Sequence, residues 1–276
     1  MSAFLEEMAL GSRARVREAQ ARCSLGALER LATAAPAPPP LRLDASGFDL
    51  IAELKLRSPA SGRLAAADED LAGRVGSYAR AGAAAVSVLT EPSRFEGSLQ
   101  HLAAAATVLT PLGVPALRKD FVVDPYQLYE ARAAGAGGVL IILRMLSATE
   151  TSALLECARR LGLFVLLEAF DEQDIALMHE LIEAHRGPTA LLAGLNCRDL
   201  TTLEVVPERL LELGSLLPTA VPRVAESGVT SAQDARAVAA AGYSLALVGS
   251  ALMRGGDAQQ LAGSLIAAGR AARRAG

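Results

Sequence analysis

The chain has 276 residues, of which 51% are hydrophobic and 4% aromatic, with 27 Lys and Arg against 30 Asp and Glu. This composition supports a large hydrophobic core and excludes a disordered chain, while the formal net charge of -3 excludes a global basic field that would attract nucleic acid or an anionic membrane. No apolar run approaches the about 20 residues of a membrane span and the first residues lack a signal-peptide pattern, so we expect a cytoplasmic protein with neither nucleic-acid nor membrane partners.

The first 34 residues are predicted to be helical, because apolar side chains recur at helical spacing in two stretches: Leu5, Met8 and Leu10, then Leu25, Leu28 and Leu31. The sequence APAPPP at residues 35–40 is stiff and extended and ends this helical part. About 40 residues rarely form an independent core. We therefore predict that residues 1–45 are an N-terminal helical extension packed on a single domain formed by residues 46–276.

Eight short apolar runs follow, each before a stretch compatible with a helix; they span residues 48–55, 84–90, 115–120, 138–144, 163–169, 191–197, 222–228 and 245–250. Several of the helical stretches stop at a glycine just before the next run, as at Gly162 and Gly242, which suits the residue after a helix end. Such alternation predicts parallel β-α units. Eight units in about 230 residues favour an α/β fold with one closed (β/α)8 TIM barrel over the alternative, an open doubly wound sheet.

Charged or amide side chains stand where the apolar runs end: Glu53 and Lys55, Lys119, Glu168, Asn196 and Arg198, and Glu226. A parallel strand buried on both faces is normally apolar throughout, and an unpaired buried charge costs several kcal/mol. A single charge at a strand end is usually a solvated rim position, and Glu53 with Lys55 can be a purely structural ion pair. Two lysines and three glutamates from several strand ends predict instead an active site at the carboxyl-terminal mouth of the barrel.

A phosphate site is predicted at the ends of the seventh and eighth runs, which carry Ser227 and Gly228, and Gly249 and Ser250. Glycine permits close backbone approach, serine adds a hydroxyl, and a helix that starts there offers free N–H donors. The loops after strands 7 and 8 are the usual phosphate site of barrel enzymes. The alternative is that both pairs form ordinary turns.

Metal and disulfide chemistry is not expected. The three cysteines, Cys23, Cys157 and Cys197, are an odd number without zinc-type spacing, and the three histidines do not cluster. Reduced thiols and no bound metal are therefore predicted. Cys197 follows Asn196 on the opposite face of its strand, so we interpret it as a small packing residue.

Several stretches of the chain resemble the indole-3-glycerol phosphate synthase family. They are IAELKLRSPASG (51–62), VLTEPSRFEGSL (88–99), ALRKDFVVDPYQLYEARAAGA (116–136), LLEAFDE (166–172), GLNCRDLTTLEV (194–205), VAESGV (224–229) and LVGSALMR (247–254). They cover essentially the whole predicted barrel in the family's order and spacing, and LRKDFVVDPYQ is the most specific of them. An additional helix before the barrel is also a family feature.

The resemblance implies a carboxy-lyase without metal or cofactor that converts 1-(2-carboxyphenylamino)-1-deoxyribulose 5-phosphate to indole-3-glycerol phosphate. Carbon dioxide and water are released, and the reaction belongs to tryptophan or other indole biosynthesis. Lys119 matches the family's catalytic acid, and we expect neighbouring cations and partial burial to lower its pKa. Lys55 matches the lysine that holds the substrate carboxylate. Glu168 matches the residue for the later proton transfers, while Glu53 and Asn196 match positions that orient these groups.

The resemblance also assigns residues that bind the substrate. Ser58, Arg198 and Glu226 match family site positions, although a rim salt bridge is an alternative for Arg198. Ser227, Gly228, Gly249 and Ser250 match the phosphate binders. Phe95, Phe121 and Leu140 match apolar contacts of the anthranilate ring; the two phenylalanines are expected to sandwich a planar ring, although ordinary core packing is the alternative for all three.

Two rival functions remain at this stage. A related phosphosugar barrel such as phosphoribosylanthranilate isomerase needs a Cys/Asp acid–base pair, and no such pair stands at the strand ends. A non-catalytic paralogue that binds a phosphorylated ligand or a partner subunit would be expected to lose Lys119 or Glu168, and both are present. A monomer that acts on a small phosphorylated substrate is the expected form.

Overall fold

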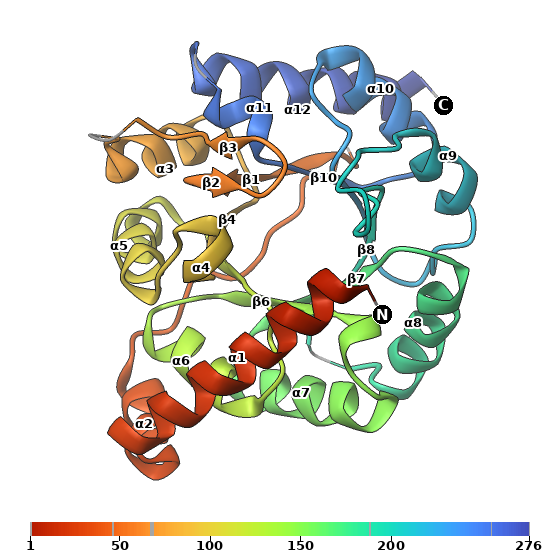
Figure 1. The fold of residues 1–276 in the computed structure, drawn as a ribbon. Helices are drawn as coiled ribbons and strands as arrows, with labels where there is room; N and C mark the ends of the chain where they lie inside the picture. Colours follow the sequence, from red (N-terminus) through yellow and green to blue (C-terminus); the bar gives the residue numbers. More distant parts are fainter. Residues whose placement is uncertain (1, 46, 67–68, 188, 255, 276) are drawn as a thin grey trace.

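The computed structural model describes residues 2–45, 47–66, 69–187, 189–254 and 256–275; Met1, Ser46 and Gly276, which bound the two predicted segments, lie outside the described residues. Eight parallel strands close into a barrel in the order β1-β10-β9-β8-β7-β6-β5-β4 (Figure 1). They are β1 (Asp49–Leu54), β4 (Ala85–Leu89), β5 (Ala116–Lys119), β6 (Gly138–Ile142), β7 (Phe164–Ala169), β8 (Leu191–Asn196), β9 (Arg223–Glu226) and β10 (Leu245–Val248). The (β/α)8 prediction is confirmed and the open doubly wound sheet is excluded.

Helices alternate with the barrel strands and cover the outside of the barrel (Figure 1). They are α3 (Leu71–Arg80), α4 (Pro92–Phe95), α5 (Leu99–Leu109), α6 (Pro125–Ala133), α7 (Ala148–Leu161), α8 (Glu172–Ala184), α9 (Glu208–Gly214), α10 (Ala232–Ala240), α11 (Ser250–Met253) and α12 (Ala258–Ala275). Two 3-10 turns, η1 (Thr110–Leu112) and η2 (Leu143–Met145), and a hairpin of β2 (Arg57–Ser58) and β3 (Gly62–Arg63) complete the elements. Gly162 and Gly242 have φ angles of 67° and 95° after α7 and α10, as the helix-end prediction requires.

Two helices precede the barrel, α1 (Ala3–Arg22) and α2 (Leu25–Ala34). Ser2 and Ser24 cap their N-termini through the side-chain oxygen, so the predicted helical stretch is interrupted at Cys23 and Ser24. In Figure 1, α1 crosses in front of α6 and β6, and α2 lies beside α6. Leu5 and Met8 of α1 are buried in the same hydrophobic cluster as the barrel residues.

The register of the barrel places the polar strand ends at one level. Leu89 of β4 pairs with Lys119 of β5, and Asn196 of β8 pairs with Glu226 of β9. Because the strands are parallel, their carboxyl ends meet at the same rim. Most strand residues below this level are apolar and buried; Asp49, Ser87 and Arg118 are buried polar exceptions. Among the described residues, none of the helices combines the length and the apolar character needed to cross a membrane.

Candidate active site

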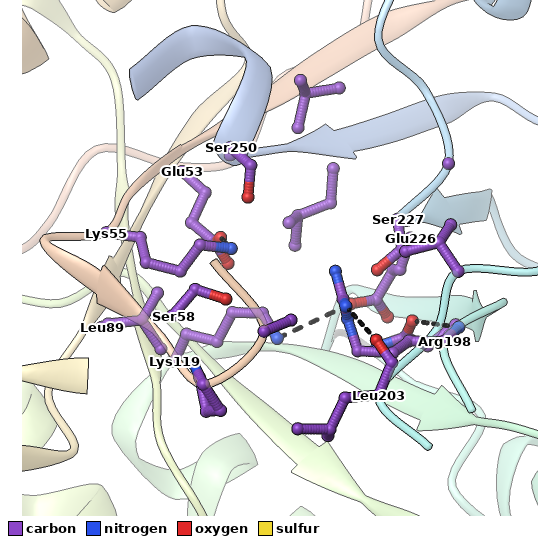
Figure 2. Close-up of a pocket in the computed structure, with 18 of the residues that line it drawn as sticks. Glu53, Lys55, Ser58, Leu89, Lys119, Arg198, Leu203, Glu226, Ser227 and Ser250 are labelled. Carbon is purple, nitrogen blue, oxygen red and sulfur yellow. Dashed lines mark hydrogen bonds and ion pairs between the residues drawn. The ribbon is translucent and has the colours of Figure 1, made fainter. Parts of the chain in front are cut away.

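A cavity of about 650 Å³ opens at the carboxyl ends of the barrel strands. Every residue predicted for the site lines it: Glu53, Lys55, Ser58, Phe95, Lys119, Phe121, Leu140, Glu168, Asn196, Arg198, Glu226, Ser227, Gly228, Gly249 and Ser250. Figure 2 shows Lys55 and Lys119 reaching into this space from one side and Arg198 from the other. The barrel therefore brings together in one cavity residues that lie up to about 200 positions apart in the chain.

Lys119 occupies the centre of a carboxylate cluster. Its Nζ lies 3.9 Å from Glu168 Oε1 and 3.9 Å from Glu226 Oε2. Burial and the nearby Arg198 lower the pKa of Lys119, but attraction by Glu168, Glu226 and Glu53 outweighs them, and the net shift is upward. The expectation of a lowered pKa was wrong, because three glutamates surround the ammonium and their charges exceed the effect of the neighbouring cations.

Lys55 forms the second lysine–glutamate pair of the cavity, with its Nζ 2.5 Å from Glu53 Oε1. Burial alone would raise the pKa of Glu53, but the charges of Lys55, Lys119 and Arg198 lower it by more. The net shift of the pKa is downward, so the carboxyl is ionised. Gly249 of the neighbouring loop makes room for this carboxylate, since a Cβ at Gly249 would collide with Glu53. Lys55 and Lys119 are the only two lysines in the sequence.

Glu168 is fixed in place by Asn196 on the next strand. Asn196 Nδ2 donates to Glu168 Oε1 at 2.6 Å, and its own Oδ1 accepts from the Arg198 N–H at 3.0 Å. The amide orientation follows from these two contacts, because only the NH2 group can donate to a carboxylate. The same oxygen, Glu168 Oε1, lies 3.9 Å from Lys119 Nζ, so Asn196 holds this oxygen close to the lysine.

Glu226 is buried to 1% exposure and neither of its carboxylate oxygens has a hydrogen-bond partner in the described structure. Burial and repulsion by Glu168 raise the pKa of Glu226 well above its usual range, and the attraction of Lys119 offsets this only in part. Gly194 leaves space for the side chain, since a Cβ there would collide with Glu226 Oε1. A buried carboxyl group without hydrogen bonds is costly, and groups with strongly shifted pKa values are concentrated at functional sites.

The predicted phosphate residues form one end of the cavity. Ser227 and Gly228 have consecutive positive φ angles of 65° and 75°, and Ser227 is one of three non-glycine residues with positive φ in the described chain. Such backbone is strained for a residue with a Cβ and is typical of ligand-binding loops. Gly249 and Ser250 begin the single turn of α11. Ser250 points into the cavity in Figure 2.

Arg254 also lines the cavity near this end, and sequence reasoning missed it. It stands four residues after Ser250, so the two side chains share a face of the turn. Its Nη2 donates to Ser61 Oγ at 2.7 Å, between β2 and β3. This four-residue spacing from a predicted phosphate residue is the signal that could have identified Arg254.

An apolar wall of the cavity contains Phe95, at the end of α4, and Phe121, which follows β5. Their ring centroids are 6.2 Å apart at 45°, and Phe4 of α1 packs edge-on against Phe121. Rings in contact with each other leave no space for a third ring between them, so the expected sandwich was wrong. Phe4 and Leu5 of α1 line the cavity as well, although the sequence analysis assigned neither to the site.

The surroundings of Ser58, Arg198 and Cys197 test three further interpretations from the sequence. Ser58 is buried in β2. Arg198 Nη1 donates to the Leu203 carbonyl at 2.6 Å and has no ion pair within the described residues, which disfavours the rim salt bridge. Burial raises the pKa of the Cys197 thiol to about 11, which fits a packing residue and not a nucleophile. In the described ranges, no three His, Cys, Asp or Glu side chains are grouped so that they could hold a metal ion.

The fold and this cavity define a (β/α)8 barrel whose carboxyl-terminal mouth holds two lysines among glutamates, with Ser and Gly residues after the last two strands. Solved barrels resemble it in fold alone: 3-hexulose-6-phosphate synthase from Salmonella typhimurium has a TM-score of 0.62 at 15% identity, with 81% of this chain and 99% of that chain covered. A tryptophan synthase structure from M. tuberculosis has a TM-score of 0.55 at 18% identity, with 82% and 94% covered.

Sequence relatives are much closer. The profile described as indole-3-glycerol phosphate synthase matches residues 5–265. The indole-3-glycerol phosphate synthase of Parafrankia sp. (strain EAN1pec) is 42% identical over 267 residues, with 96% of each chain covered. That of Mycobacterium tuberculosis (strain CDC 1551 / Oshkosh) is 40% identical over 271 residues, with 96% of this chain and 94% of the relative covered. The chain belongs to the indole-3-glycerol phosphate synthase family, whose members are decarboxylating lyases of tryptophan biosynthesis.

Proposed function

We propose that this protein closes the indole ring of 1-(2-carboxyphenylamino)-1-deoxyribulose 5-phosphate, forming indole-3-glycerol phosphate, carbon dioxide and water. The observation that carries the proposal is the ion pairing of Lys119 with Glu168 and Glu226 in a cavity that is also lined by an apolar wall and by the two Ser and Gly pairs. The substrate has the same three parts: an aromatic ring, a reacting carbonyl and a phosphate.

Lys119 acts as the general acid of the proposed reaction. The aromatic carbon that bears the carboxylate attacks the ketone, and Lys119 donates a proton to the ketone oxygen as it becomes a hydroxyl. The raised pKa keeps Lys119 protonated at neutral pH, so the proton is available in every free enzyme molecule. Loss of carbon dioxide then leaves its bonding electrons in the ring and restores the aromatic system.

Dehydration follows and requires an acid and a base on neighbouring atoms. A lysine ammonium protonates the departing hydroxyl group, which leaves as water, and Glu168 takes the carbon-bound proton whose removal completes the indole ring. Asn196 supports this role because its 2.6 Å hydrogen bond fixes one oxygen of Glu168. Lys55 holds the substrate carboxylate before it is lost, and Glu53 holds Lys55.

The phosphate is proposed to bind between Ser227 and Gly228 on one side and Gly249 and Ser250 on the other. Their hydroxyl and N–H groups supply hydrogen bonds, and Arg254 supplies the charge from the same turn as Ser250. The anthranilate ring is proposed to lie against the wall of Phe95 and Phe121, with Leu140 as a further apolar contact. This orientation puts the ketone next to Lys119.

We further propose that the enzyme works as a cytoplasmic monomer with residues 1–45 and 46–276 acting as one domain. Two observations support this form: the residues of α1 and of the barrel share one hydrophobic cluster, and the groups required by the chemistry come from a single chain. The three cysteines are free thiols, as a reducing compartment favours.

The test supplies purified protein with the carboxyphenylamino substrate in the presence of a chelator and follows the rise of indole fluorescence. Turnover is expected, together with one carbon dioxide per indole product. Glu168→Gln keeps the shape and the Asn196 contact but removes the base, and we expect kcat to fall at least about a hundredfold. A folded wild-type protein that does not turn over this substrate would contradict the proposal.

A further inference from the structure

The segment that directly follows Lys119 is held by α1, which lies more than a hundred residues earlier in the chain. Arg15 Nη2 donates to Asp120 Oδ1 at 2.7 Å, and Ser12 Oγ donates to the carbonyl of Phe121 at 2.5 Å. Phe4 adds an edge-on ring contact to Phe121, with centroids 5.9 Å apart. These three residues of α1 recur at helical spacing, so one face of the helix contacts the end of β5.

Asp120 is the centre of these contacts. Its Oδ1 accepts from Arg15 and from the Phe121 N–H at 2.8 Å, and its Oδ2 accepts from Thr90 Oγ1 at 2.7 Å and from Arg118 Nη2 at 3.1 Å. Burial alone would raise the pKa of Asp120, but Arg118, Arg15 and Thr90 lower it by more, and the net shift is downward. The side chain is therefore a charged acceptor with four donors. Asp120 thereby joins β5 to the end of β4 and to α1.

Arg15 has a second buried partner on the neighbouring strand end. Its Nη1 lies 3.3 Å from Glu91 Oε1, and the Glu91 carboxylate caps α4 by accepting from the N–H groups of Ser93 and Arg94. The last residue of α4 is Phe95, which lines the cavity. One guanidinium thus spans the corners that present Phe95 and Lys119, a geometry that the planar fork of arginine allows and a lysine ammonium does not.

Lys119 depends on this arrangement through the backbone. Successive side chains of a strand point to opposite faces, so Lys119 enters the cavity while Arg118, which does not line it, anchors the strand from the other face. Asp120, just after β5 and at the edge of the cavity, anchors the strand end. Arg118 Nη1 completes the anchor with contacts to the Gln127 carbonyl at 2.7 Å and to Glu130. A shift of the Asp120 backbone would displace the ammonium, and misplacement of a reacting group by about 1 Å can cost about a hundredfold in rate.

We propose that Arg15 is a positioning residue of the ring closure, which acts through Asp120 on the aim of Lys119. The inference rests on the proposed function, because it assigns the catalytic proton to Lys119. We expect the fold to tolerate the loss of Arg15, because its side chain is 29% exposed and both carboxylates keep other hydrogen-bond donors without it. Without Arg15, Asp120 would keep its hydrogen bonds to Thr90, Arg118 and the Phe121 N–H, but its position would be less tightly constrained.

The kinetic test compares Arg15→Gln and Arg15→Lys with Arg22→Gln, a control that removes the same charge from the exposed end of α1, where Arg22 pairs with Glu18. We expect Arg15→Gln to lower kcat about tenfold with KM within about threefold of wild type, and Arg15→Lys to lie between the two. Arg22→Gln is expected to retain wild-type kcat. Equal kcat in Arg15→Gln and Arg22→Gln would overturn the inference.

A double-mutant cycle tests the route through Asp120. If Arg15 acts through Asp120, adding Arg15→Gln to Asp120→Asn lowers kcat by less than about twofold, whereas independent effects would multiply. Thermal unfolding of each variant, followed by circular dichroism, shows which variants are folded under the assay conditions. Should Asp120→Asn fail to fold, the three single variants of α1 and the spectrum described next decide the question.

The chain has two lysines, so a protein labelled with 13Cε-lysine gives two side-chain signals, which a Lys55→Arg variant assigns. We expect Arg15→Gln to shift the Lys119 signal and leave the Lys55 signal in place, and Arg22→Gln to move neither. A Lys119 signal unchanged in Arg15→Gln would contradict the inference whatever the activity. If wild-type protein shows no turnover, the proposed reaction is wrong, and the spectrum alone decides whether Arg15 positions Lys119.

Discussion

Lys119→Met removes a cation that lies between two buried carboxylates, and we expect it to reduce stability as well as activity. The ammonium is 3.9 Å from an oxygen of Glu168 and 3.9 Å from an oxygen of Glu226, whose side chains are 2% and 1% exposed. At an effective dielectric constant of about 20, unit charges at this separation attract by roughly 4 kcal/mol. Loss of one partner from a buried ion pair costs about 3–5 kcal/mol, so we expect a loss of that order in the free energy of unfolding at pH 8.

The size of this loss should depend on pH. The pKa of Lys119 is raised in the folded protein, so its contribution to stability is complete below the ordinary value of 10.5 and is lost only as the pH rises above it. The pKa of Glu226 is raised too, so its ionisation costs stability as the pH rises above 4.5. Without Lys119, the carboxyl groups can avoid this cost only by binding protons. We therefore expect the loss in Lys119→Met to be largest at pH 8 and to shrink towards pH 5.

A double variant separates stability from catalysis. Lys119→Met with Glu226→Gln removes both members of one pair, so we expect it to recover at least half of the stability lost at pH 8 without recovering turnover. Urea unfolding at pH 5, 6.5 and 8, followed by far-ultraviolet circular dichroism, measures the first quantity, and indole fluorescence measures the second. A double variant no more stable than Lys119→Met, or a Lys119→Met protein with wild-type kcat, would refute the reasoning.

Three further predictions address the rest of the cavity. Ser250→Asp places a negative charge beside the proposed phosphate and should raise KM at least about tenfold, whereas Ser250→Ala should change it much less; similar KM values in both would argue against this phosphate site. Gly249→Ala forces the Glu53 carboxylate aside and should destabilise the protein by about 1–3 kcal/mol and lower kcat/KM; the control Gly263→Ala, where a Cβ has open space, should do neither, and unfolding in urea and steady-state kinetics check both. The 13Cε signal of Lys119 should not titrate below pH 10, and a midpoint near neutral pH would contradict the raised pKa.

The sequence alone was sufficient for the architecture and for the polar residues at the strand ends, but it missed Arg254, Phe4 and Leu5, which also line the cavity. Strand periodicity, helix-ending glycines and the direction of parallel strands are local properties, so the eight strands were located to within two residues at each end. The polar residues that close those strands, such as Lys119 and Glu168, then meet at one rim because parallel strands all end on the same side.

The properties of the site were decided by contacts between distant parts of the chain. The pKa of Lys119 depends on carboxylates from β1, β7 and β9, which come close to it only when the barrel closes. The sequence therefore led to the wrong direction for the pKa shift. The aromatic wall, which replaces the expected sandwich, depends on the ring angles of Phe95 and Phe121 and on the docking of α1. In the sequence, nothing distinguishes Arg15 from an exposed helical arginine; its contact with Asp120 forms only when α1 packs against the end of β5. Strand polarity and periodicity are determined by consecutive residues. Electrostatics and side-chain positions depend instead on which elements the tertiary structure brings within a few ångströms of one another.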